Sequence, residues 1–366
     1  MELYGGVRCL YIFVRSLWKQ PCPDPRPETP NRAIPFLQLP VELVWLVAEF
    51  LTPAEIALFS LTCRPIRAVL GEGSSAAHLS RDDYLAYLVG LARDLPKQWV
   101  CGVCTALHPT LKFDTPSAFN LRRASCPKHH AGYNRPNMCL GRFQICLEHH
   151  HVQLALKYTR LQQREYNSYL QALLKPYHTR YYKSSSRTIS PHKTFYSAYP
   201  RVVTDNHGNL RFLLLSTWQY LRGSRDISLN NLGGRIICPH LDFNFWTYHH
   251  YHTNALATAV HQVFKAEDTN SSEERAGGCP RCATDFSVRL SRGDLLLYVW
   301  QDFGPESSPF DLAWQSQIMG GSLVPGVFNN SPWSGLTLYH EPGSVKKLYY
   351  ESEPESRPDL ASKRVV

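Results

Sequence analysis

Residues 37–51 read Leu-Gln-Leu-Pro-Val-Glu-Leu-Val-Trp-Leu-Val-Ala-Glu-Phe-Leu, and this stretch decides how the N-terminal part of the chain folds. Its large apolar residues recur at helical spacing and share one face of a predicted helix. They are Leu39, Leu43, Leu46, Val47 and Phe50. Pro40 suits the first turn of that helix, where its missing N–H breaks no hydrogen bond. Trp45 projects from another side, between Glu42 and Glu49, which indicates a surface that another molecule covers.

Two further short helices follow directly. Thr52 and Glu55 form a capping box with Pro53 at the first helical position, which predicts the start of the second helix. Pro65 begins a third helix, and Gly71 ends it. Three helices in about 35 residues bury too little surface to be stable alone. The sequence therefore predicts that this module needs a partner.

The order of motifs in this module resembles the F-box. In sequence, they are Leu39-Pro40-x-Glu42-Leu43, Phe50-Leu51, the run from Leu58 to Leu61, and Cys63-Arg64. The F-box docks on the Skp adaptor subunit of cullin-RING ubiquitin ligases, so the resemblance implies a Skp-binding surface. The residues it assigns to that surface are Leu39, Pro40, Leu43, Val47, Leu51, Ile56 and Leu58. Pro65 departs from the pattern, because many F-boxes continue a helix at that point.

Composition predicts a folded chain with two or three domains. Of its 366 residues, 43% are hydrophobic and 12% aromatic, enough for a sizeable core, and 26 prolines against 21 glycines indicate many short elements. The formal charge of +9 is uneven: between Lys112 and Arg201 there are fifteen Lys and Arg residues against three acids. This basic segment suits a polyanion on charge alone.

The cellular compartment decides whether paired cysteines are expected to form disulfides or to bind metal. The N-terminus does not look like a secretory signal, because Glu2 replaces the expected positive charge and the apolar run Cys9–Val14 ends at Arg15. No stretch approaches the roughly 20 apolar residues that a membrane span needs. We expect no membrane partner and a reducing cytoplasmic or nuclear location. Paired cysteines among the eleven are therefore interpreted as metal ligands before disulfides.

The predicted fold class is α+β. A three-helix F-box precedes a mixed α/β module with short antiparallel hairpins and structural zinc sites. The hairpin signals are Asn206-His-Gly-Asn209 and the turn at residues 291–294, and a helix is expected over 152–174. The predicted segments are a Pro-rich tail (1–35), the F-box (36–71), a linker helix (72–98), a basic Cys/His-rich region (99–200), an α+β module (201–350) and a disordered tail (351–366).

The later cysteine cluster has the spacing of a zinc site. A tetrahedral zinc site takes four thiolate or imidazole ligands, often as two close pairs. Cys279-Pro-Arg-Cys282 supplies one pair, and Cys238-Pro-His240 supplies the other. The histidines that compete with His240 for the fourth position are His249, His250 and His252. The alternative interpretation is a pair of buried cysteines beside a hairpin.

An earlier cluster offers a second site of the same kind. The proposed ligands are Cys101, Cys104, Cys146 and His149. Their competitors are His108, Cys126, Cys139 and His150. The alternative interpretation is a solvated helix start rich in histidine. Neither cluster shows an open coordination position with a placed glutamate, as hydrolytic zinc requires, so both are predicted to be structural.

Most of residues 36–350 carries a second resemblance, to a group of fungal F-box proteins with a C-terminal Cys/His-rich module. The motifs begin with Trp99-x-Cys101-x-x-Cys104-x-x-Leu107-His108-Pro109, Cys238-Pro-His240 and Cys279-Pro-Arg-Cys282-Ala-Thr-Asp285-Phe-Ser-Val288. They continue with Trp300-Gln-Asp-Phe-Gly304, Ser308-Pro-Phe-Asp-Leu-Ala-Trp314 and Pro342-Gly-Ser-Val345. The resemblance implies one co-inherited C-terminal module and names no ligand for it.

The predicted function is that of a substrate receptor in a Skp–cullin–F-box ubiquitin ligase, which positions an unidentified target protein for degradation and is not itself an enzyme. Phosphate-loop, nucleophile-elbow, zinc-protease and dinucleotide-binding motifs are missing from the sequence. One alternative is a zinc-containing protein that binds nucleic acid through the basic segment, whose interleaved tyrosines would stack on bases. Another is a cysteine-dependent enzyme.

Overall fold

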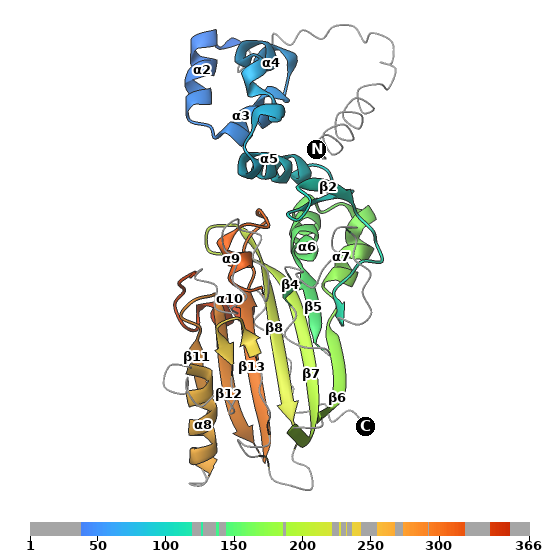
Figure 1. Cartoon of the computed structure of the whole chain (residues 1–366), viewed down its shortest axis with the longest axis vertical. Helices are drawn as coiled ribbons and strands as arrows, with labels where there is room; N and C mark the ends of the chain where they lie inside the picture. The colour runs from blue at the N-terminus through green and yellow to red at the C-terminus, as the bar shows by residue number, and fades with distance from the viewer. Residues whose placement is uncertain are drawn as a thin grey trace. The chain divides into compact units, whose positions relative to one another are not determined.

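The computed structural model describes residues 38–118, 126, 137–138, 144–185, 188–221, 227, 232, 236–242, 255–267, 274–291, 293–318 and 337–351. It confirms a mixed α/β fold with antiparallel sheets and an N-terminal helical stretch (Figure 1). The chain divides into two compact units. One holds the helices up to Leu95 together with Cys104–Leu107, and the other holds Pro96–Val103 and the chain from His108 onward.

The first unit begins with three short helices, α2 (Val41–Glu49), α3 (Pro53–Ser60) and α4 (Arg64–Leu70). Their shared core is small. It consists of Val44, Ala48, Ile66 and Leu70, with Ile56, Phe59, Cys63 and Val69 packed around it. The predicted capping box is present, because Glu55 N–H donates to Thr52 Oγ1 and Thr52 N–H donates to the Glu55 carboxylate.

Pro65 fits the third helix despite its departure from the motif. It lies in the first turn of α4, where no intrahelical N–H bond is required. Gly71 ends the helix with a φ of 70°, in the left-handed region that favours glycine.

Helix α5 (Arg81–Arg93) completes the first unit after two 3-10 turns, η3 (Glu72–Ser74) and η4 (Ala76–His78). Ser80 caps α5 by accepting the N–H of Asp83. Helix α3 packs closely on α5, and a Cβ at Gly90 would lie 2.3 Å from Leu58 Cδ1. Glycine at this position is therefore what lets the Leu58 side chain rest against the α5 backbone.

The second unit is built on a six-stranded antiparallel sheet with the order β11-β12-β13-β8-β7-β6 (Figure 1). Its strands are β6 (Tyr177–Ser185), β7 (Thr188–Thr204), β8 (Leu210–Tyr220), β11 (Glu274–Gly278), β12 (Thr284–Ser291) and β13 (Asp294–Asp302). Both predicted hairpins are confirmed. The β7–β8 turn places Gly208 at φ 82°, and the β12–β13 turn places Gly293 at φ 81°.

Alternation along the strands gives the sheet two different faces. One face is apolar and buried, with Tyr196, Trp218, Leu297 and Val288 side by side through the strand register. Helices α6 (His149–Leu161) and α8 (Ala255–Glu267) pack on the strands, α6 on β7 and β8 and α8 on β11 and β12. On the opposite face, helix α10 (Ser344–Glu351) packs through Val345 and Tyr349.

The expected helix over 152–174 is two helices. Helix α6 ends at Gln162, whose φ of 51° is left-handed, and α7 (Asn167–Leu173) follows the 3-10 turn η7 (Arg164–Tyr166). The reversal stacks the Tyr158 and Tyr166 rings at 4.7 Å, so aromatic packing at the corner offsets the cost of the left-handed residue.

The remaining elements are short. They are β1 (Gln98–Cys101), β2 (Ala106–Pro109), β3 (Ser117–Ala118), β4 (Asn137–Met138), β5 (Ile145–Glu148), β9 (Ile236–Cys238), β10 (Leu241–Asp242) and α9 (Leu312–Gln315). Strands β1 and β2 pair, β9 and β10 pair, and β5 lies between β3 and β4. Among the described helices, none has the length and hydropathy to cross a membrane.

Asp285 follows the Cys279-x-x-Cys282 motif closely and caps the start of α10 with its carboxylate. Its carboxylate accepts the N–H groups of Gly343 and Lys346 and lies 3.0 Å from His340 Nε2. Burial raises the pKa of this carboxyl, but hydrogen bonds from His340 and from the two backbone groups outweigh burial and lower it from 3.8. Two motifs that are distant in sequence thus meet through one carboxylate.

This arrangement predicts an acid-sensitive contribution to stability. Because the folded pKa of Asp285 is lowered, the contribution is present above pH 3.8 and is lost as the pH falls towards the folded pKa. We expect Asp285→Asn to destabilise the fold by about 1–3 kcal/mol at neutral pH. We also expect a smaller drop in Tm than the wild type shows between pH 5 and pH 3, measured by circular dichroism. Parallel Tm–pH curves for the two proteins would contradict this role.

Gly304 is a second position that the fold restricts. Its φ is 88°, and a Cβ there would lie 2.6 Å from Ala313 Cβ. Gly304→Ala should therefore combine backbone strain with overpacking and cost about 2–4 kcal/mol in chemical denaturation. Gly208→Ala is the matched control, because Gly208 has a similar φ of 82° but open space around its Cβ position. Equal losses in both variants would contradict the packing argument.

Candidate docking face and metal centres

The outward side of α2 is apolar. Leu43, Leu46, Val47 and Phe50 follow the i, i+3, i+4, i+7 spacing of one helical face, and they are 43%, 49%, 37% and 84% exposed. The core of the module uses a different face of the same helix, through Val44 and Ala48. The four exposed residues are called the α2 face below. It is a large apolar surface for so small a module.

The other residues that the F-box resemblance assigns to Skp binding differ in their exposure. Leu39 and Pro40 are exposed, whereas Leu51, Ile56 and Leu58 are half-buried. Ile56 packs on the module core, and Leu58 packs on α5 at Gly90. Trp45 is 47% exposed on a separate side of α2, as the sequence predicted.

The structure brings the later cysteine cluster together as one buried group. The ligand atoms of Cys238, His240, Cys279 and Cys282 lie within 4.8 Å of one another. Cys238 ends β9, and His240 lies in the tight turn to β10. The three competing histidines at 249, 250 and 252 lie outside the described residues. This is the four-residue set that the sequence predicted.

Local hydrogen bonds fix the shape of the Cys279–Cys282 turn. Arg281 N–H donates to Cys279 Sγ at 3.4 Å, and Cys279 N–H donates to the carbonyl of Thr284. Thr284 Oγ1 lies 3.2 Å from Cys282 Sγ and donates to Gln317 Oε1. Both sulfurs are thus directed and supported by neighbouring groups, as the ligands of structural metal sites are.

The ring of His240 gives the strongest argument that this group holds a cation. The residue is 6% exposed, and neither ring nitrogen has a hydrogen-bond partner among the described residues. A buried imidazole without a hydrogen bond is costly unless another group satisfies it. With three sulfurs beside it, a coordinated cation would satisfy it. The donor set of three sulfurs and one nitrogen suits Zn²⁺.

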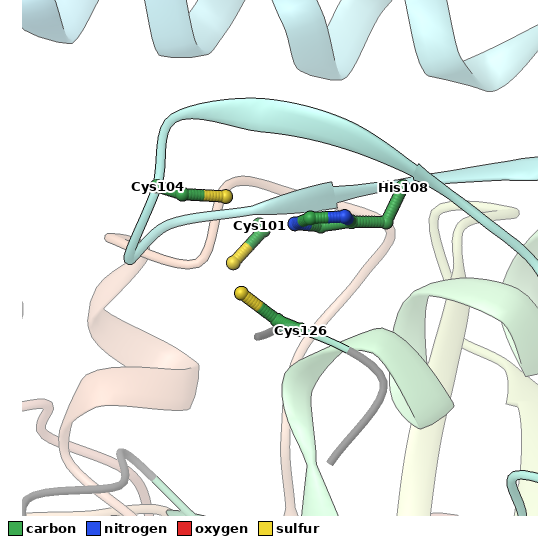
Figure 2. A group of neighbouring side chains, drawn as sticks. All are labelled: Cys101, Cys104, His108 and Cys126. Atoms are coloured by element: carbon green, nitrogen blue, oxygen red, sulfur yellow. The ribbon is translucent and has the colours of Figure 1, made fainter. Parts of the chain in front are cut away.

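The second group, in which two of the four side chains are buried and two are half-buried, differs from the predicted set (Figure 2). It comprises Cys101, Cys104, His108 and Cys126, whose ligand atoms lie within 4.8 Å of one another. Cys101 ends β1 and His108 lies in β2, with Cys104 between them, so one hairpin supplies three of the four side chains. The Trp99 ring lies 4.9 Å from the His108 ring.

Cys146 and His149 do not join this group, which corrects the predicted ligand set. Cys146 is buried in β5, opposite Ser117 of β3. His149 starts α6 and packs edge-on against Trp314 at 5.3 Å. Burial lowers the pKa of His149 to about 3, and the neighbouring His150 lowers it further, so the ring is neutral at physiological pH. Cys146 in β5 and His149 at the start of α6 are therefore buried elsewhere in the unit.

The sequence offers His108 and Cys126 only as competitors of the four proposed metal ligands. The signal for His108 is the hairpin itself: two paired four-residue strands return a histidine beside the cysteine at the end of the first strand. Cys126 has no such signal, since only the fold brings it near the hairpin. The other competitor, Cys139, lies outside the described residues.

A third cluster, which the sequence did not reveal, joins Asp114, His150 and His151. His150 Nε2 lies 2.9 Å from Asp114 Oδ2, and His151 Nε2 lies 3.2 Å from Asp114 Oδ1. Burial raises the pKa of Asp114, but hydrogen bonds from both histidines outweigh it and lower the pKa far below its ordinary value.

The hydrogen bonds indicate that this third cluster has a structural role and does not bind metal. His151 Nδ1 accepts the backbone N–H of Glu148, so a neutral ring carries its proton on Nε2 and donates it to Asp114. Nε2 then has no lone pair for a metal. His150, a competitor for the first metal site, likewise contacts Asp114 through Nε2. The Trp99 ring stacks on the His150 ring at 4.5 Å.

The described cations of the basic segment lie in different surroundings. Lys157 is fully buried and donates to the carbonyl of Gln98, and Arg160 pairs with Glu306 at 3.0 Å. Three of its tyrosines lie in the core and are unavailable for base stacking. They are Tyr158, Tyr166 and Tyr169. Some described cations of the segment are thus buried or paired, whereas others, such as Lys112, are exposed.

Comparisons of the chain with protein-family models, with curated proteins and with solved structures found no match. The eight described cysteines form no disulfide with one another.

Proposed function

We propose that the chain is an F-box substrate receptor, which docks on the Skp subunit of a cullin-RING ubiquitin ligase through the α2 face. It would present an unidentified target protein with its second unit, acting in the cytoplasm or nucleus. The observation that carries the proposal is an apolar helical face left outside a module that already has a core. Burying each of these side chains would contribute about 1.5–3 kcal/mol.

The proposed role is positioning and requires no chemistry from this chain. A receptor that holds a target beside the ubiquitin-loaded conjugating enzyme raises the effective concentration of the target's lysines there. Co-expression with a Skp subunit followed by size-exclusion chromatography tests the docking. A receptor that never co-elutes with Skp would contradict it.

We assign zinc to the two cysteine groups as a structural cofactor. Cys238, His240, Cys279 and Cys282 would hold one ion, and the Figure 2 residues would hold another. Burial raises the pKa of the Cys238 and Cys282 thiols. A bound cation reverses that direction, because coordinated thiols are deprotonated. Each ion would join segments that are distant in sequence and stabilise a unit with several short strands.

Nucleic-acid binding through the basic segment is not favoured. The buried Tyr158, Tyr166 and Tyr169 are unavailable for the base stacking that the alternative needs. The cysteine-enzyme alternative gains no support from the two four-residue groups, whose sulfurs are grouped as ligands rather than paired with a single base.

A further inference from the structure

The sheet face that bears α10 is half-exposed beyond that helix. Strand register places Phe195 of β7 beside Arg180 of β6 and, across β8, in the same row as Leu296 of β13. Arg180 is exposed, and Phe195 and Leu296 are half-exposed. The residues next to Phe195 and Leu296 along their strands, which lie on the opposite face, are buried. This row therefore presents apolar and basic side chains together.

Two cations lie on the aromatic ring of this row. Arg180 Cζ is 5.0 Å from the Phe195 ring centroid, and Lys193 Nζ is 5.3 Å from it. In the described part of the chain, neither has a carboxylate at ion-pair distance. The described acids in the strands of this face are occupied by other groups. They are Glu274 with Lys346, Asp285 with the start of α10, Asp294 with Gln219 and Asp302 with Arg211. Among the described residues, the two cations at the β6–β7 side therefore have no neighbouring carboxylate.

We infer that Arg180, Lys193, Phe195 and Leu296, the cation–aromatic face, bind an acidic segment of a protein. The inference deepens the proposed receptor function and depends on it for the identity of that protein as the target. Carboxylates complement the two cations, and the half-exposed apolar groups provide contact area for an extended chain. Stacked bases fit poorly, because the two cations already cover the Phe195 ring.

The test is fluorescence anisotropy with the full-length chain and two labelled probes. One probe is a twelve-residue peptide of alternating Glu and Ser, and the other is single-stranded DNA. The peptide is expected to bind, with an affinity that falls as salt rises. The double variant Arg180→Glu/Lys193→Glu should weaken binding roughly tenfold or more. The control Lys112→Glu/Arg164→Glu makes the same charge change at exposed positions elsewhere in this unit and should change binding less than about twofold.

Each other outcome overturns the inference. If the wild-type protein does not bind the peptide, the proposed site does not exist. Equal losses of peptide affinity in the two double variants would show unspecific attraction to a basic protein. Tighter binding of DNA that is lost in Arg180→Glu/Lys193→Glu assigns the face to nucleic acid. Co-elution with Skp is measured in parallel. It should be unchanged by this variant, so that failure of the peptide site and failure of Skp docking are separate results.

Discussion

Leu43→Asp is expected to abolish co-elution of the chain with a Skp subunit while leaving the chain folded. The Leu43 side chain is 43% exposed at the centre of the α2 face and contributes nothing to the small core of the module. Loss of its burial in the complex, with a charge placed in an apolar interface, should cost at least about 3 kcal/mol, or more than 100-fold in affinity. Size-exclusion chromatography of co-expressed proteins, with titration calorimetry of the purified pair, measures the loss.

Two variants control for folding and for charge. Ala77→Asp adds the same charge at an exposed position outside α2–α4 and should leave docking within about twofold of wild type. Val44→Asp places the charge in the module core, so it should lower Tm as well as docking. Leu43→Asp that still co-elutes with Skp would contradict the assignment of the α2 face. Loss of docking in Ala77→Asp would show that added charge alone is responsible.

Removal of zinc is expected to have the largest effect on the second unit. Elemental analysis should find about two zinc ions per chain, and Cys279→Ser should lose one of them. Because coordination free energy is folding free energy at such sites, the loss should cost several kcal/mol, at least about 3, and a chelator should lower Tm of the wild type more than that of the variant. Folded protein without bound metal would contradict both assignments.

The first centre has a sharper test, because two ligand sets make opposite predictions. The structure groups Cys126 with Cys101, Cys104 and His108, whereas sequence spacing favours Cys146. Cys126→Ser should lower zinc content by one ion, and Cys146→Ser should retain both. Both substitutions exchange a buried sulfur for oxygen, so each is the matched control of the other. Retention of both ions in Cys126→Ser would contradict the grouping in Figure 2.

Local signals were enough to predict the helices of the first unit and the hairpins of the second. The Thr52–Glu55 box, Gly71 and the glycines at 208 and 293 act within a few residues, so their effects are visible in the sequence. Helical spacing also predicted that the residues of the α2 face share one side of the helix, but it did not show that Val44 and Ala48 form the core instead. In the polar, Ser-rich stretch after Tyr181, β6 and β7 continue as paired strands without a pattern of residues that signals them.

Contacts between segments that are distant in the chain could not be predicted from the sequence. Cys126 joins the hairpin, and Asp114 joins two adjacent histidines, only because the chain between them folds back. The single helix expected over 152–174 failed for a related reason: the left-handed Gln162 is stabilised by ring stacking that forms only in the folded state. Burial likewise decided which cations of the basic segment reach solvent, as for Lys157.

The order of segments in the two units has a consequence for synthesis on the ribosome. Helices α2 to α5 are contiguous up to Arg93, whereas the large sheet is complete only with β13, and α10 covers it still later. At about 5–20 residues per second, the roughly 250 residues from α5 to the end of α10 take some 13–50 s to make. The α2 face therefore emerges well before the sheet can close. A Skp subunit that binds the nascent chain would shield this face throughout that interval.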